Sequence, residues 1–249
     1  MTIKVSLFIA LFATFSLADT IKVALAANVS YAIEDLKKEF SRLYPDTKVQ
    51  VVLGSTGKLT AQIRNKAPYD ILMGANMLYP EALYKEGFAV TRPLIYAKGS
   101  LALVSSKKHD LSKGIKTITN ESIKRIAIAN PKTAPYGKAT IEALSNAKLY
   151  DTINKKLIYG ESISQTLTYA MKGADLGFIA KSLLYSPQMK HLKKDKQWIE
   201  VDPKLYTPID QGVVILKHGE GNCEVAAFYS FILSQKAKSI FEKFGYIIP

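Results

Sequence analysis

Residues Val23–Leu36, with the sequence VALAANVSYAIEDL, join a run of apolar residues to an amphipathic one. The run from Ile21 to Ala27 has the composition of a buried strand. Beyond Asn28, apolar residues recur at the spacing of one helix face. They are Val29, Ala32, Ile33, Leu36, Phe40 and Leu43. Because asparagine is a favoured N-cap residue, the sequence predicts a strand, a cap at Asn28 and then a helix.

A strand that passes directly into a helix places the helix start beyond the carboxyl end of the strand, where open α/β sheets bind ligands. The first turn of a helix offers unpaired N–H groups and a partial positive charge, which suit an anion. One such junction is more simply an ordinary capped helix. The sequence, however, predicts three further starts of this kind, at Ser55, Tyr136 and Ile163.

Strand and helix patterns alternate from Thr20 onward, which predicts an α/β fold with mostly parallel sheets flanked by helices. The expected strands and extended regions after the first cover 48–53, 69–74, 94–104, 125–129, 156–159, 175–180, 198–201 and 212–216. The expected helices cover 55–65, 77–86, 138–147, a stretch from 163, 224–233 and 237–244.

Two extended crossings, near 95–101 and 205–213, suggest that the chain forms two lobes joined by a hinge. We expect residues 19–97 plus 207–249 to form lobe 1 and residues 98–206 to form lobe 2. Ligand pockets favour the cleft between such lobes. Each lobe would contribute two of the four helix starts, so closure would bring their donors around one point.

Residues 1–18 have the features of a secretory signal peptide: Lys4 at the charged start, an apolar stretch, and small residues before a cleavage point near Ala18-Asp19. The apolar stretch is too short for a comfortable membrane span. We therefore expect an exported mature chain. Its only cysteine, Cys223, allows no intrachain disulfide and is expected to be a small buried residue.

The formal net charge of the chain is +13, which by itself is compatible with nucleic acid, a membrane surface or small anions as partners. The lysines are spread along the sequence, and no motif of a nucleic-acid-binding module is present. We expect no nucleic-acid partner. The four helix starts are surrounded by Ser, Thr, Asn and Gly, and Glu161, the one acidic residue near them, is expected to point to solvent.

Eight short segments follow one another along nearly the whole expected mature chain. They are AANVS at 26–30, GSTGKLTAQI at 54–63, APYDI at 67–71, NPKTAPYG at 130–137, SISQTL at 162–167, GADLGF at 173–178, YTPIDQG at 206–212 and FEKFGY at 241–246. In this ordered set the chain resembles the periplasmic molybdate-binding proteins, the solute receptors of molybdate ABC importers.

The resemblance implies a two-lobed type II periplasmic binding protein fold that holds an oxyanion through neutral donors. By position, the contacts from lobe 1 fall on Asn28 and Ser55, through side chains and backbone N–H groups. Those from lobe 2 fall on Tyr136 and Ile163, mainly through backbone N–H groups. The implied ligand is molybdate or tungstate, with no cofactor and no directly ligated metal. The implied partner is the membrane permease of an ABC transporter, and the receptor is expected to be a periplasmic monomer.

Some members of that family add a tyrosine hydroxyl at the position of Ala180, and some have serine at the position of Asn28. Alanine cannot make a hydroxyl's hydrogen bond. We therefore expect the side chain of Tyr136 or of Asn28 to supply the missing donor.

Two other functions remain open from the sequence. Phosphate is protonated at neutral pH and usually requires a carboxylate that accepts its proton, and no carboxylate falls at the four helix starts. Sulfate, molybdate and tungstate carry no proton, so all three remain possible ligands. An exported hydrolase is less favoured, because His109, His191 and His218 lie far apart without metal-ligand spacing. No nucleophile-elbow motif is present either. We expect a receptor and not an enzyme.

Overall fold

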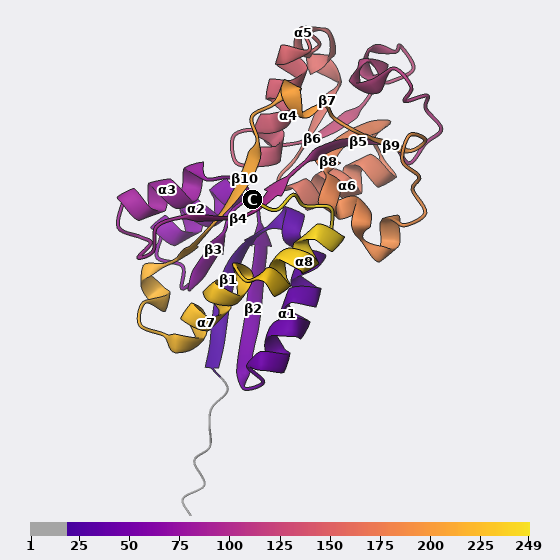
Figure 1. The fold of residues 1–249 in the computed structure, drawn as a ribbon. Helices are drawn as coiled ribbons and strands as arrows, with labels where there is room; N and C mark the ends of the chain where they lie inside the picture. The colour runs from indigo at the N-terminus through magenta and orange to yellow at the C-terminus, as the bar shows by residue number, and fades with distance from the viewer. Residues whose placement is uncertain (1–18) are drawn as a thin grey trace, which may run out of the picture.

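The computed structural model of this chain describes residues 19–249, and the predicted signal peptide, residues 1–18, lies outside the described residues. The elements gather around two five-stranded sheets. Figure 1 shows the sheets in different halves of the molecule, each with its own helices. We call each sheet, with the helices packed on it, a lobe. The α/β fold class predicted from the sequence is confirmed.

The first sheet has the strand order β2-β1-β3-β10-β4. Its strands are β1 (Asp19–Ala26), β2 (Thr47–Gly54), β3 (Ile71–Met73), β4 (Leu94–Gly99) and β10 (Ile209–Ile215). Strand β1 pairs in parallel with β2 and β3, whereas β10 runs antiparallel to β3 and β4. Every strand except β10 therefore runs in the same direction, and β1, β2 and β3 end at a common edge.

Helices cover both faces of the first sheet. They are α1 (Ala32–Leu43), α2 (Thr56–Arg64), α3 (Leu78–Lys85), α7 (Cys223–Ile232) and α8 (Gln235–Lys243). Val23 and Leu25 of β1 belong to the core shared with α1, α7 and α8, while Ala24 between them packs with α2 and α3. Because successive side chains of a strand point to opposite faces, a strand covered on both sides needs consecutive apolar residues, and β1 supplies them from Val23 onward.

The second sheet has the order β7-β6-β8-β5-β9. Its strands are β5 (Leu101–Val104), β6 (Ile126–Ala129), β7 (Leu157–Gly160), β8 (Leu176–Ala180) and β9 (Trp198–Glu200). Strands β6, β7 and β8 are parallel, and β5 runs antiparallel to β8 and β9. The helices of this lobe are α4 (Pro135–Asn146), α5 (Tyr150–Ile153) and α6 (Ile163–Lys172).

The chain passes between the two sheets at Ser100, between β4 and β5, and returns between β9 and β10. Strand β10 begins at Ile209, three residues before the expected start at Gly212. Gln211, which was expected in the connection before this strand, therefore lies within β10 of the first sheet. The predicted lobe limits, 19–97 plus 207–249 and 98–206, stay a proposal about how the chain divides.

Short 3-10 turns complete the fold. They are η1 (Ala27–Val29), η2 (Gly114–Thr119), η3 (Asn154–Lys156), η4 (Lys181–Tyr185), η5 (Pro187–Met189), η6 (Pro203–Leu205) and η7 (Lys217–Gly219). Within residues 19–249, every helix falls short of the length and apolar character that a membrane span requires. The prediction of a buried Cys223 is wrong: it is exposed as the first residue of α7, because the apolar face of that helix begins with Val225.

Candidate functional site

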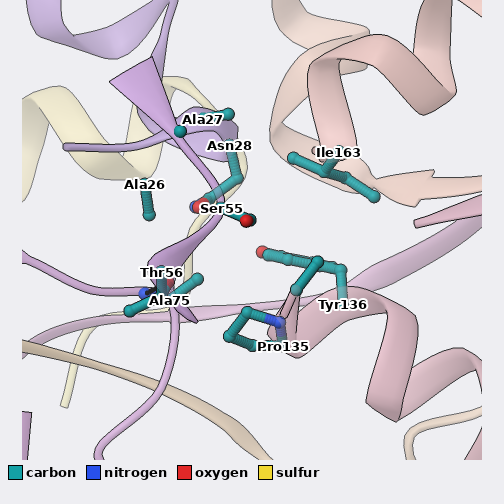
Figure 2. Close-up of a pocket in the computed structure, with 11 residues that line it drawn as sticks. Ala26, Ala27, Asn28, Ser55, Thr56, Ala75, Pro135, Tyr136 and Ile163 are labelled. Carbon is teal, nitrogen blue, oxygen red and sulfur yellow. Dashed lines mark hydrogen bonds between the residues drawn. The ribbon is translucent and has the colours of Figure 1, made fainter. Parts of the chain in front are cut away.

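A small cavity lies between the two lobes, at the carboxyl ends of β1 and β2. It is lined from the first lobe by Ala26, Ala27, Asn28, Gly54, Ser55, Thr56 and Ala75, and from the second lobe by Ala134, Pro135, Tyr136 and Ile163. The cavity leaves about 10 Å³ for the centre of a water-sized sphere, about the room that one water molecule needs. Figure 2 shows the side chains of Ser55 and Tyr136 approaching each other across it.

Ser55 occupies the N-cap position of α2, but its side chain makes no capping hydrogen bond. The residue is 4% exposed. Its Oγ is unpaired, by which we mean that it has no hydrogen-bond partner within residues 19–249. A buried unpaired hydroxyl costs about 1–3 kcal/mol. The cavity therefore holds a donor that the rest of the described chain does not use.

The predicted N-cap role of Asn28 is wrong. Asn28 lies inside the 3-10 turn η1, and α1 begins only at Ala32, after an N-cap residue, Tyr31. The reason is that the buried side chain of Asn28 bonds elsewhere. Its Nδ2 donates to Gln211 Oε1 at 2.7 Å and to the Tyr246 hydroxyl at 2.9 Å. Its Oδ1 is unpaired within the described chain.

The backbone of Asn28 is also held from both lobes. Its carbonyl oxygen accepts from the Tyr246 hydroxyl at 2.8 Å and from Ser182 Oγ at 3.0 Å. Ser182 lies two residues after Ala180, the position at which the family resemblance implied a missing hydroxyl. The 3-10 turn η4 thus places a hydroxyl from the second lobe on Asn28.

Tyr136 lies in the first turn of α4, which starts at Pro135. This is one residue before the predicted helix start at Tyr136 and three before the expected range 138–147. Proline suits this position because its fixed φ matches the helix and its missing N–H is not needed there. The Tyr136 hydroxyl is buried and unpaired within residues 19–249. A Cβ on Gly99, the last residue of β4, would clash with this hydroxyl, so only glycine leaves room there.

The tyrosine hydroxyl remains a neutral donor. Burial raises the pKa of Tyr136 well above its ordinary value, and the nearby tyrosines, Tyr246, Tyr96 and Tyr206, raise it further. The charged form of a phenol is disfavoured where water is excluded. Tyr136 therefore keeps its proton across the physiological pH range.

Ile163 is the first residue of α6, and the preceding Ser162 caps the helix by accepting from Gln165 N at 3.3 Å. The Ile163 side chain is buried with the core of the second lobe and also lines the cavity. Figure 2 shows it on the side of the cavity opposite Ser55. A hydrophobic residue here leaves only the backbone N–H as a polar group for a ligand.

The two lobes touch around the cavity. Gly57 N donates to Thr133 O at 2.9 Å, and Ser164 Oγ donates to Ala27 O at 3.0 Å. Glu161 is exposed, as predicted, with 69% of its side chain accessible, and its Oε2 also lies 2.5 Å from Lys58 Nζ across the cleft. Opposite charges at facing helix starts account for this pair, although both side chains remain about half exposed or more.

The lining is neutral. None of the described residues around the cavity is acidic or basic, and within residues 19–249 no cluster of His, Cys, Asp and Glu could hold a metal ion. Helices α2, α4 and α6 all begin at this cavity. Helix starts carry a partial positive charge, and neutral hydroxyls add donors. The arrangement can bind a small anion without an ion pair.

The structure brings the four predicted residues, Asn28, Ser55, Tyr136 and Ile163, to one cavity; that they bind an anion stays a prediction. Sequence reasoning did not find Gln211 and Tyr246, which hold the Asn28 side chain. They are 183 and 218 residues away from Asn28, and the sequence carries no periodic signal for such a contact. Both lie in segments of the family resemblance, which was the only available pointer.

Comparisons with known proteins agree over nearly the whole chain. The molybdate-binding protein ModA of Azotobacter vinelandii is 35% identical over 246 residues, which cover 97% of this chain and 95% of the relative. ModA of Rhodobacter capsulatus is 32% identical over 233 residues, covering 92% and 89%. The solved Azotobacter vinelandii periplasmic molybdate-binding protein superposes with a TM-score of 0.85 at 30% identity, covering 92% of this chain and 99% of that one. The family model described as bacterial extracellular solute-binding protein matches residues 21–247, and this chain belongs to that family.

Proposed function

We propose that this protein is a periplasmic receptor that binds molybdate, and tungstate in its place, and delivers the oxyanion to the permease of an ABC importer. The observation that carries the proposal is the pair of buried hydroxyls, Ser55 and Tyr136, which face one cavity from different lobes and have no partner within residues 19–249. A bound oxyanion would satisfy both. Both relatives are named molybdate-binding proteins, which favours molybdate among the anions that the cavity could bind.

The chemistry of the lining favours a fully deprotonated tetrahedral dianion. Each oxygen of such an ion accepts hydrogen bonds and donates none. The cavity offers hydroxyls and the starts of three helices, and none of its described lining residues is a carboxylate that could accept a proton from the ligand. A hydrogen bond to a charged group contributes about 1.5–3 kcal/mol, so a handful of them supports tight binding after the costs of ordering.

We further propose that binding occurs by closure of the two lobes. The contacts between Gly57 and Thr133 and between Lys58 and Glu161 exist only when the lobes meet. A ligand that touches both lobes stabilises the closed form relative to an open one. The hinge would be formed by the connections near Ser100 and before β10. On this view the protein is a monomer, has no catalytic activity, and is released from residues 1–18 after export.

Isothermal titration of residues 19–249 with molybdate, tungstate, sulfate and phosphate, in a buffer without phosphate, tests the proposal. We expect saturable one-to-one binding of molybdate and tungstate, far weaker binding of sulfate, and no binding of phosphate. If only sulfate binds, the protein is still an anion receptor, but the proposed ligand is wrong. Turnover of an ester or amide substrate would contradict the receptor class itself.

A further inference from the structure

In two side-chain carboxamides, those of Asn28 and Gln211, one end is hydrogen-bonded and the other end is not, within the described part of the chain. The unbonded end is the oxygen in Asn28 and the nitrogen in Gln211. The Nδ2 of Asn28 makes two hydrogen bonds, to Gln211 Oε1 and to the Tyr246 hydroxyl, while its Oδ1 is unpaired in the described chain. The Oε1 of Gln211 accepts from Asn28 and from the Tyr96 hydroxyl at 2.9 Å, while its Nε2 is unpaired within residues 19–249. Gln211 is completely buried and Asn28 is 2% exposed.

This arrangement leaves only the wrong end of the Asn28 carboxamide free for an anion. Asn28 lines the cavity, yet its N–H groups are used by Gln211 and Tyr246. The end that remains is an acceptor oxygen, which repels a dianion. A carboxamide has nearly the same shape at both ends, so a half-turn about its terminal torsion exchanges donor and acceptor without displacing the neighbours.

We propose that Gln211 is a positioning residue that sets the direction of the Asn28 carboxamide, and that both carboxamides are reversed when an anion is bound. In the reversed state Gln211 Nε2 donates to Asn28 Oδ1, and Asn28 Nδ2 donates to the anion. This inference rests on the proposed function, because it assigns a role to the anion that the cavity would hold.

The surrounding hydroxyls can follow the reversal. The Tyr96 hydroxyl already lies 3.3 Å from the carbonyl oxygen of Gly74, so it can donate there and accept from Gln211. The Tyr246 hydroxyl can turn from the carbonyl of Asn28 to its Oδ1, since Ser182 Oγ still donates to that carbonyl at 3.0 Å. Each hydroxyl rotates freely between donor directions, so the polar groups around Asn28 remain paired.

The reversal also changes what faces Tyr136. A Cβ built on Gly99 would clash with the Tyr136 hydroxyl and lie 2.9 Å from Gln211 Nε2, so both groups approach Gly99, the last residue of β4. With Gln211 reversed, its Oε1 takes that place and presents an acceptor on the side of the tyrosine hydroxyl. Only a carboxamide can present either end, which is why glutamine, and not glutamate or methionine, suits this position.

A double-mutant cycle tests the role of Gln211. Gln211→Met keeps the length of the side chain and removes both amide ends. We expect it to weaken molybdate binding by about tenfold or more, the loss of one hydrogen bond to a charged group. In an Asn28→Ser background we expect less than about a twofold further loss, because a serine hydroxyl orients itself without Gln211. Gln197→Met, at a glutamine whose Oε1 accepts from Lys193 N in the second lobe, is the matched control and should leave affinity unchanged.

A second measurement uses the unmodified protein and does not depend on any variant folding. With ¹⁵N-labelled side-chain amides, the amide protons of Asn28 should show a nuclear Overhauser contact to the ring of Tyr246 without ligand. Saturation with molybdate should remove this contact, because Nδ2 turns toward the anion.

The outcomes separate the two proposals. Equal losses for Gln211→Met in both backgrounds, or a contact between Asn28 and Tyr246 that persists at saturation, overturn the role of Gln211 and leave the receptor function intact. Failure of the unmodified protein to bind molybdate overturns the proposed function, and this inference falls with it.

Discussion

The backbone N–H of Gly57, in the first turn of α2, donates a 2.9 Å hydrogen bond to the carbonyl oxygen of Thr133, in the loop before α4. This bond joins the two lobes beside the cavity. A Cβ at position 57 would lie 2.8 Å from that oxygen and 2.7 Å from the hydroxyl of Tyr79. The close approach of the lobes therefore depends on a glycine in a helix, at a position where glycine otherwise destabilises.

Gly57→Ala should separate closure from folding. We expect molybdate affinity to fall by about tenfold or more, since a lost interlobe bond and a clash both oppose closure. The free energy of unfolding without ligand should stay the same or rise by up to about 1 kcal/mol, because alanine is the better helix residue. Titration and urea unfolding measure the two effects. Gly173→Ala, where a Cβ would meet only a distant backbone oxygen at 3.9 Å, is the control; a normal affinity for Gly57→Ala would refute closure at this point.

Ser55→Ala should weaken binding without destabilising the protein. Its hydroxyl makes no capping bond, so its removal costs no helix stability, whereas a bound anion loses a donor worth about 1.5–3 kcal/mol. Ser234→Ala is the matched control, because Ser234 Oγ caps α8 by accepting from Ala237 N. That variant should lose about 1 kcal/mol of stability and keep its affinity. An unchanged affinity for Ser55→Ala would remove Ser55 from the site.

Tyr136→Phe should lower affinity by about tenfold if the hydroxyl donates to the anion, with the unfolding free energy unchanged or slightly higher. The raised pKa of Tyr136 leads to a second prediction, which concerns the pH dependence of binding. Affinity should be flat from about pH 6 to about pH 9, because the phenol stays protonated well beyond its ordinary pKa of about 10. Burial of the neutral phenol contributes fully to the free energy of unfolding below the ordinary pKa of about 10. This contribution is lost as the pH rises above that pKa toward the raised pKa of the folded protein. Titrations across this range check the claim, and a loss of binding centred near neutrality would contradict it.

Lys58→Met should have only a small effect on affinity, about threefold or less at low salt. The pair with Glu161 crosses the cleft, but its two side chains are 48% and 69% exposed, and exposed ion pairs are weak and screened by salt. The measurement is affinity at two ionic strengths. A large loss that persists in high salt would mean that Lys58 contacts the anion directly.

Asp175→Asn should lower stability at neutral pH and leave binding unchanged. Partial burial alone would raise the pKa of this carboxyl, but bonds from the Lys107 ammonium and from the N–H groups of Arg125 and Lys124 outweigh it and hold the pKa well below its usual range. A depressed folded pKa adds stability above the unfolded pKa of about 3.9, and this stability is lost as the pH falls through the folded value. We expect a cost of about 1–3 kcal/mol at pH 7 that shrinks below about pH 4. Urea unfolding at both pH values measures it, and an equal cost at both would contradict the assignment.

The fold class and the succession of strands and helices along the chain could be predicted because they depend on local patterns. The apolar run of β1 indicates a strand that is buried on both faces. The helical spacing after Asn28 indicates a helix that is buried on one face. The starts of α2 and α6 were predicted within a residue, since Ser55 and Ser162 occupy their N-cap positions. The N-cap role of Asn28 was predicted wrongly, because a local preference for capping was outweighed by distant partners.

The sequence by itself determined an α/β chain in which several helix starts surround a polar site, because periodicity and residue type are properties of neighbouring residues. Only the tertiary structure decided which end of the Asn28 carboxamide is hydrogen-bonded and which is left unpaired within residues 19–249. That direction depends on Gln211, brought in by β10, and on Tyr246, near the end of the chain. A hydrogen bond is directional and acts over about 3 Å, so such contacts between distant parts of a sequence exist only after the chain has folded.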